Sequence, residues 1–95
     1  MTSKERAKLK GMANKLNTTI QIGKNGVTDE VICQVREAIT ANELIKIRVL
    51  ETAGLTAKET AAALSEAIDA EVVQVIGARI VLFKENPEKK VIEFR

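Results

Sequence analysis

The chain has 95 residues, a hydrophobic fraction of 45% and a net charge of +2, which predicts one soluble globular domain over residues 1–95 rather than a disordered polypeptide. The chain has one cysteine, Cys33, and no histidine, so it lacks the residues for an internal disulfide, for the common zinc sites and for the commonest general base. We therefore expect no metal, no cofactor and no enzymatic activity. No apolar run approaches the roughly 20 residues of a membrane helix, and no apolar signal segment follows the charged N-terminus, so the expected location is cytoplasmic.

The first predicted element is a basic amphipathic helix over residues 3–16. Its apolar residues recur at helical spacing and would face the core: Leu9, Met12, Ala13 and Leu16. Basic residues flank this stripe, with Lys4, Lys8 and Lys15 along one edge and Arg6 and Lys10 across the exposed side. Residues 1–26 hold six basic residues against one acidic residue, a net charge of +5, so the remainder sums to −3. This asymmetry favours contact with a polyanion, although a solvated lysine-rich helix gives the same pattern.

A short strand, a glycine-rich turn and a second helix follow. Residues 18–22 alternate polar and apolar types and are rich in β-branched side chains, which favours a strand. The strand ends at Gly23-Lys24-Asn25-Gly26, called the GKNG turn below, and Thr28 then suits the N-cap of a helix. The buried side of this helix is predicted to consist of Val31, Ile32, Val35, Ala38 and Ile39. Cys33 points away from that side and is expected to be partly exposed.

The middle of the chain predicts another strand and a third helix. Residues 43–50 alternate, so Ile45, Ile47 and Val49 share one face while Lys46 and Arg48 share the other. Thr56 and Glu59 have the spacing of a capping box, which marks the start of the third helix. Its inward side is predicted to be Ala61, Leu64 and Ile68.

The last predicted elements are two strands in a hairpin. Residues 71–76 and 79–84 flank Gly77-Ala78, and a glycine at the first position of a two-residue loop is typical of a type II′ turn. Simple alternation places one apolar face beneath the helices: Val73, Val75, Ile80 and Leu82. The opposite face would carry Val72, Gln74, Ile76, Arg79, Val81 and Phe83. Residues 85–95 are expected to form a C-terminal tail.

The element order is helix, strand, helix, strand, helix, strand, strand. Strands separated by helices generally become parallel neighbours in one sheet, whereas the hairpin strands pair antiparallel. The sequence therefore predicts an α/β fold, a two-layer sandwich with a mixed four-stranded sheet. It leaves the order of the strands in that sheet open.

The GKNG turn is the segment where several features of an anion site coincide. Gly23 and Gly26 permit a tight turn with accessible amides, Lys24 adds a positive charge, and Asn25 adds a donor and an acceptor. The helix that follows contributes unpaired amides and its dipole, which favour a phosphate. A plain glycine-rich turn gives the same four letters, and the spacing matches neither the nucleotide-triphosphate loop nor the dinucleotide fingerprint.

Three runs of the sequence carry a family resemblance. Residues 20–28, IQIGKNGVT, residues 43–47, ELIKI, and the hairpin runs VQVIG and IVLFK closely resemble the YhbY family of CRM-domain proteins. The resemblance implies a fold like the C-terminal domain of bacterial translation initiation factor 3, with a GxxG loop comparable to that of KH domains. Two departures are Asn17, where relatives often carry proline, and Phe83, which replaces a usual tyrosine.

The resemblance also implies a function. Family members bind RNA; single-domain bacterial and archaeal versions are associated with precursors of the large ribosomal subunit, and plant organelle relatives act in intron splicing. We therefore expect a monomer that binds precursor ribosomal RNA and neither a membrane nor a small-molecule substrate.

The GKNG turn would hold phosphates, surrounded by Lys4, Lys8 and Lys15. Gly26→Asp would then weaken binding and leave the fold intact. The alternative is a protein interaction module that uses the strand face with Val72, Val81 and Phe83.

Overall fold

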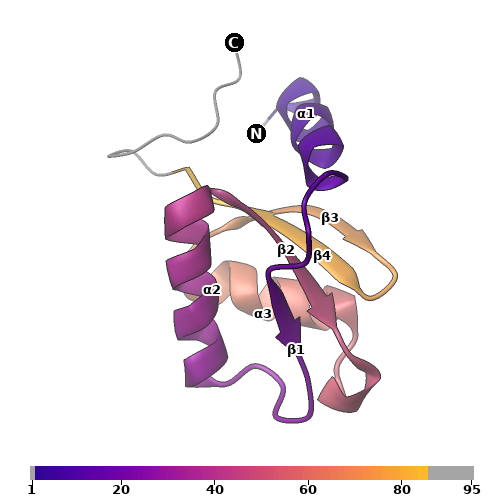
Figure 1. Ribbon diagram of the computed structural model, residues 1–95, viewed down its shortest axis with the longest axis vertical. Coiled ribbons are helices and arrows are strands. Elements are labelled where there is room, and N and C mark those ends of the chain that lie inside the picture. Colours follow the sequence, from indigo (N-terminus) through magenta and orange to yellow (C-terminus); the bar gives the residue numbers. More distant parts are fainter. Residues whose placement is uncertain (1, 86–95) are drawn as a thin grey trace.

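The computed structural model describes residues 2–85 (Figure 1). Its elements follow the expected order: α1 (Ser3–Ala13), β1 (Ile20–Ile22), α2 (Asp29–Asn42), β2 (Leu44–Val49), the short 3-10 helix η1 (Glu51–Ala53), α3 (Ala57–Ile68), β3 (Glu71–Ile76) and β4 (Arg79–Phe83). The α/β class is confirmed, and η1 is an addition that the sequence did not predict. Of the tail expected over residues 85–95, all but Glu85 lies outside the described residues.

The four strands form one mixed sheet in the order β1-β2-β4-β3. β1 runs parallel to β2, whereas β4 is antiparallel to both β2 and β3, as expected for strands joined by a helix and by a hairpin. Gly77 has a φ of 56°, and Ala78 is not among the described residues with positive φ, which agrees with the predicted type II′ turn.

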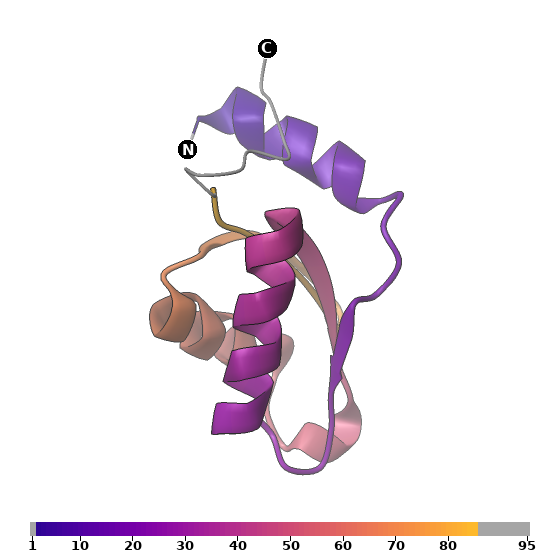
Figure 2. The ribbon, with the colours of Figure 1, turned by 60° about the vertical axis from the view of Figure 1, so that its left-hand side comes forward.

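Helices α2 and α3 cover one face of this sheet (Figure 2). The apolar sides of both helices pack there against alternate residues of the strands, and the fully buried residues include Ile22, Val35, Ile39, Ile45, Ile47, Leu64, Ile80 and Leu82. This is the predicted two-layer core. Cys33 lies on the outer side of α2 and is exposed.

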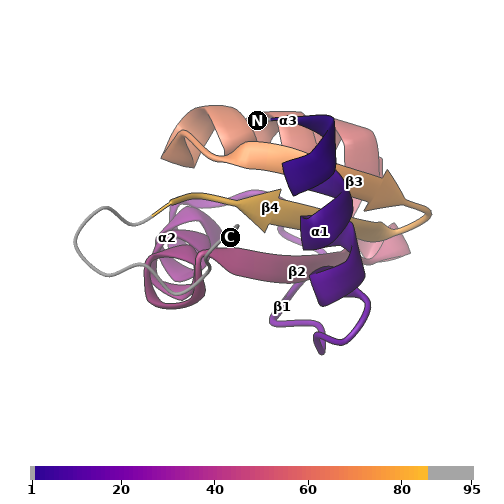
Figure 3. The same ribbon diagram turned by 90° about the horizontal axis from the view of Figure 1, so that it is seen from above.

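Helix α1 crosses the other face of the sheet (Figure 3). Leu9 and Ala13 are buried there in a second apolar cluster with residues of β2, β3 and β4: Leu44, Val73, Val81 and Phe83. The helix ends three residues earlier than expected, so Leu16 is 37% exposed instead of completing the buried stripe. The fold therefore has a third, partial layer beside the predicted sandwich.

A β-bulge in β3 decides which valine faces which cluster. Val72 pairs with Leu82 and Gln74 pairs with Val81, so Val73 is an extra residue between them. Val72 consequently packs against the main core and Val73 against α1, the reverse of the simple alternation predicted from the sequence.

Arg6 of α1 fastens the helix at this bulge. Its Nη1 donates to the carbonyl oxygens of Val72 and Val73, over 2.6 and 3.1 Å. The sequence placed Arg6 on the exposed side of the helix, and this is wrong, because the side chain turns towards the sheet and is partly buried.

Two helices begin with a capping box. Thr2 and Glu5 exchange backbone and side-chain hydrogen bonds at α1, and Thr56 and Glu59 do the same at α3, which confirms the prediction for Thr56. The hydrogen bonds donated by the threonine amide and hydroxyl hold the pKa of each glutamate below its ordinary value. Within residues 2–85 no helix is both long and apolar enough to cross a membrane.

Candidate functional site

The GKNG turn joins β1 to α2 and is closed by its own backbone. The amide of Gly26 donates to the carbonyl oxygen of Gly23 over 2.9 Å, so this amide is already engaged. Gly26 adopts a φ of 65°, in the left-handed region that favours glycine. Lys24 and Asn25 at the tip are exposed. The turn therefore presents the side chains of Lys24 and Asn25 at its tip, while the amide of Gly26 is turned inward.

Gly26 itself is buried. A Cβ at this position would lie 3.6 Å from the carbonyl oxygen of Ala53 and 3.7 Å from Leu55 Cδ1, on a backbone that L residues rarely adopt. The expectation that Gly26→Asp leaves the fold intact is therefore corrected: an aspartate there strains the turn and puts a carboxylate into a packed site. Tests of the turn belong at Lys24 and Asn25.

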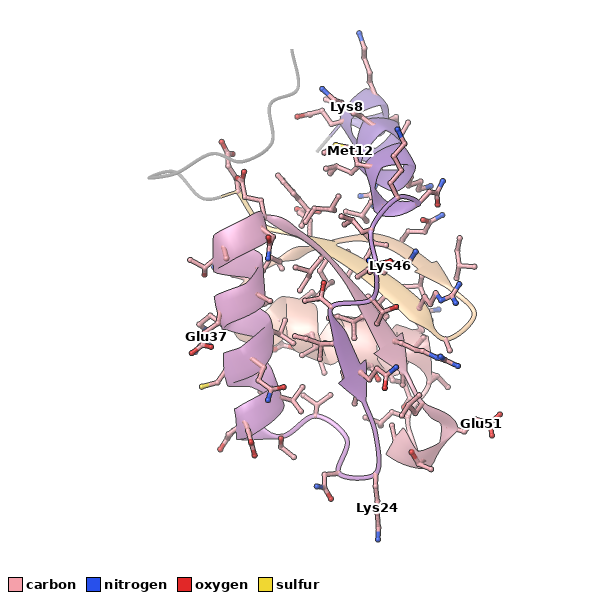
Figure 4. The ribbon with its side chains drawn as sticks, in the orientation of Figure 1. Lys8, Met12, Lys24, Glu37, Lys46 and Glu51 are labelled. Atoms are coloured by element: carbon pink, nitrogen blue, oxygen red, sulfur yellow. The ribbon has the colours of Figure 1, made fainter. Side chains whose placement is uncertain are left out.

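The N-terminus of α2 is less favourable for an anion than the sequence suggested. The hydroxyl of Thr28 already accepts a hydrogen bond from a first-turn amide over 3.2 Å. Asp29 and Glu30, both exposed, add negative charge at the positive end of the helix dipole. Glu51 lies at the same end of the molecule as Lys24 (Figure 4). These carboxylates repel a phosphate, whereas Lys24 at the tip of the turn attracts one.

The lysines of the first helix lie far from the turn. In Figure 4, Lys8 is at the upper end of the long axis and Lys24 at the lower end. α1 is held at the bulge of β3 through Arg6, whereas the turn follows the carboxyl end of β1. The expectation that Lys4, Lys8 and Lys15 surround the turn is therefore wrong, although all three are exposed. Helical spacing predicts which side of a helix is basic and not where that helix docks.

Known proteins match this chain over almost its whole length. Residues 1–84 match the CRS1 / YhbY (CRM) domain. The chain belongs to this family. A relative from Bacillus subtilis, "Probable RNA-binding protein YqeI", is 41% identical over 93 residues, which are 98% of this chain and 97% of the relative. An "RNA-binding protein" from Haemophilus influenzae is 32% identical over 91 residues, 96% of this chain and 92% of the relative.

The arrangement of helices around the sheet is also similar to a solved structure. The solution structure of a hypothetical protein from Staphylococcus aureus, described as a candidate RNA-binding protein, superposes with a TM-score of 0.77 at 37% sequence identity. The match covers 98% of this chain and 97% of that one. Both the CRM family and its fold, expected from the resemblance of three short runs, are therefore confirmed.

The sequence leaves open whether Lys46 and Arg48 extend the RNA-binding surface of this CRM domain, and it does not connect them with Arg79. Arg79 begins β4 directly opposite Arg48 of β2, on the face of the sheet that carries α1. Lys46 lies on the same face, and its Nζ donates to the carbonyl oxygen of Ala13 at the end of α1 over 3.4 Å. The predicted alternation of the strands placed all three on this face. That the two arginines are neighbours could not be predicted, because it depends on the order of the strands in the sheet.

The strand face offered for an alternative protein partner is covered. Val81 is 4% exposed and Phe83 is 7% exposed, because α1 packs over them. Val72 faces the main core on the other side of the sheet. These three residues are therefore interior, and a protein partner would need a different surface.

Proposed function

We propose that this CRM domain is a non-catalytic RNA-binding protein that docks on structured precursors of large-subunit ribosomal RNA and assists assembly of the large ribosomal subunit. It acts in the cytoplasm as a monomer, as one domain over residues 1–95, and without a cofactor. Membership of the CRM family, whose relatives from two bacteria carry RNA binding in their names, supports the class of ligand.

The observation that carries the proposal is the unbalanced basic charge of α1. Lys4, Lys8 and Lys15 are exposed on a helix and the turn after it, where Glu5 is the one acidic residue and serves the N-terminal cap. Such a cationic element attracts phosphates and releases their counterions on binding. The helix is rigidly placed, because its apolar side is buried and Arg6 is bonded to β3.

The GKNG turn forms a second, separate contact in this proposal. Lys24 and Asn25 are exposed at the tip and reach a phosphate at the opposite end of the molecule from α1. An RNA that touches both ends must extend along the long axis of the domain. A folded RNA with fixed shape meets this requirement better than a short flexible strand.

The scarcity of aromatic residues supports recognition of shape rather than of stacked bases. The chain has two phenylalanines and no tryptophan or tyrosine, and Phe83 is buried under α1. Proteins that bind single strands without sequence preference rely on exposed aromatic platforms. Contacts to phosphates therefore dominate the proposed binding energy.

Crosslinking in living cells tests the identity of the RNA. The tagged protein is crosslinked, purified under denaturing conditions, and the attached RNA is sequenced. We expect reads from the large-subunit ribosomal RNA to be enriched over the small-subunit RNA, with unprocessed ends among them. Enrichment confined to messenger or transfer RNA, or no crosslinked RNA at all, would refute the ribosomal assignment.

Salt dependence of binding tests the two contacts separately. Lys24→Ala should lower the slope of log affinity against log salt by about 0.7–0.9, the equivalent of one phosphate. The combined variant Lys4→Ala, Lys8→Ala and Lys15→Ala should lower it by roughly two to three times as much. Arg36→Gln on α2, whose side chain donates to the carbonyl oxygen of Ala67 on α3 over 3.4 Å, is the matched control and should leave the slope unchanged. Equal slopes for all four proteins would argue against phosphate contacts at both places.

A further inference from the structure

The part of the sheet that α1 leaves uncovered is a basic surface with polar neighbours. Beyond the end of α1 the strands direct six side chains to this face: Gln21, Lys46, Arg48, Gln74, Ile76 and Arg79. Three of them are cations, and none is a carboxylate. The surface lies between the two contacts already described, since Figure 4 places Lys46 between Lys8 and Lys24 along the long axis. We call these six residues the open sheet face.

Two arginines of the open sheet face repel each other in the absence of a ligand. Arg48 and Arg79 are direct cross-strand partners, both are exposed, and neither is ion-paired with another residue of the described range 2–85. Like charges placed opposite each other in an antiparallel pair destabilise it. An anion between the two guanidinium groups removes this repulsion, and guanidinium groups bind phosphate oxygens through paired hydrogen bonds.

A small pocket lies next to this arginine pair. Its volume is about 100 Å³, and its lining includes Asn14, Lys46, Gln74, Ile76 and Arg79. This is less than the roughly 300–1,000 Å³ of pockets that enclose whole small molecules. It therefore admits one planar group whose remainder stays outside, and not a folded helix of RNA.

The lining of the pocket suits the edge and the face of one base. The side-chain amides of Asn14 and Gln74 each offer a donor and an acceptor, and neither is engaged by another residue of the described part of the chain. Ile76 is 60% exposed beside them and supplies an apolar surface for the flat side of a base. Unpaired bases in loops and bulges present these edges, whereas paired bases in an RNA helix do not.

We propose that the open sheet face binds one unpaired nucleotide of RNA, with its phosphate between Arg48 and Arg79 and its base in the pocket beside Asn14 and Gln74. This rests on the RNA-binding function proposed above and adds a specific subsite to it. The nucleotide belongs to a bulge or loop of a structured RNA whose helical parts contact α1 and the GKNG turn. The domain thereby distinguishes an interrupted RNA helix from a continuous one.

The test compares two labelled RNA hairpins that differ only in a bulge of unpaired nucleotides in the stem. The wild-type protein should bind the bulged hairpin at least about fivefold more tightly than the fully paired one, because a good base contact contributes roughly 1–3 kcal/mol and about 1.4 kcal/mol corresponds to tenfold. The double variant Arg48→Gln and Arg79→Gln should lose this preference and most of the affinity. Gln74→Leu, which keeps the size of the side chain, should lose the preference for the bulge and keep the affinity for the paired stem.

Lys58→Gln on α3, the helix on the other face of the sheet, is the control for loss of charge. Thermal unfolding checks the fold, and the double arginine variant should be as stable as the wild type or slightly more stable, because a repulsion is removed. If the wild type binds neither hairpin, the proposed RNA-binding function fails. If it binds both and the double variant behaves like Lys58→Gln, only the nucleotide site is refuted. Polyglutamate is the probe for an acidic protein partner. If the wild type binds polyglutamate as tightly as it binds the RNA, and the same substitutions abolish that binding, the face belongs to an acidic protein and the proposal is overturned.

Discussion

Replacing Arg6 with methionine should strongly destabilise the domain although the residue lies on a basic, solvent-facing helix. Arg6 donates two hydrogen bonds, of 2.6 and 3.1 Å, to carbonyl oxygens at the bulge of β3. A hydrogen bond from a charged donor contributes about 1.5–3 kcal/mol. Because the side chain of Arg6 is only partly buried, we assign about 2 kcal/mol of unfolding free energy to the two hydrogen bonds together. For a domain of this size that loss lowers the melting temperature by roughly 8–16 °C.

Thermal unfolding followed by far-ultraviolet circular dichroism measures this loss. Lys4→Met is the matched control, because Lys4 is exposed on the same helix and should change the unfolding free energy by less than about 0.5 kcal/mol. Arg6→Lys should fall between the two, since one ammonium group reaches both carbonyl oxygens less well than a planar guanidinium. If Arg6→Met melts within 2 °C or so of Lys4→Met, the contact at the bulge does not hold α1, and the account of the third layer is refuted.

Three further changes test the local structure. Thr56→Ala should lower the free energy of unfolding by about 1 kcal/mol in chemical denaturation. At neutral pH the wild type should be more stable than Glu59→Gln, and this difference should disappear as the pH falls through the lowered pKa of Glu59. Asp69→Asn should raise stability by about 0.3–1 kcal/mol, because it removes a negative charge from the C-terminus of α3 and keeps a residue that tolerates the left-handed conformation. Gly26→Ala should cost about 1–2 kcal/mol more than Gly23→Ala in urea unfolding, because only Gly26 has a positive φ.

The elements themselves were predictable because their signals are local. The capping box at Thr56 and the glycine of the hairpin loop act within four residues. The helical spacing of apolar residues identifies the buried sides of α2 and α3 without knowledge of the rest of the fold. The bulge at Val73 was not predictable, because one extra residue in one strand depends on the pairing of the other strand. The order of the strands is equally non-local, and without it the pairing of Arg48 with Arg79 stays hidden.

The candidate site was predicted in its parts but not in its assembly. Lys24 and the α1 lysines are exposed as expected, yet they occupy opposite ends of the domain. Charge counted along the chain placed them together because they are near in sequence. Residues 14–19 carry the chain from the end of α1 on one face of the sheet to β1 at its edge, and this connection separates them.

The bulge in β3 links the fold to the proposed function. The bulge turns Val73 towards α1 and presents the carbonyl oxygens of Val72 and Val73 to Arg6. It therefore fixes both the face and the end of the sheet where the helix docks. Helix α1 therefore covers the beginning of β2 and the end of β4, around Leu44 and Phe83, and leaves the Arg48 and Arg79 end open. A regular β3 would exchange the two valines, with Val73 pointing at the main core and Val72 at α1, and would change the carbonyl oxygens available to Arg6. On this argument the same irregularity that escaped the sequence pattern determines which basic residues face solvent and which path an RNA can follow across the domain.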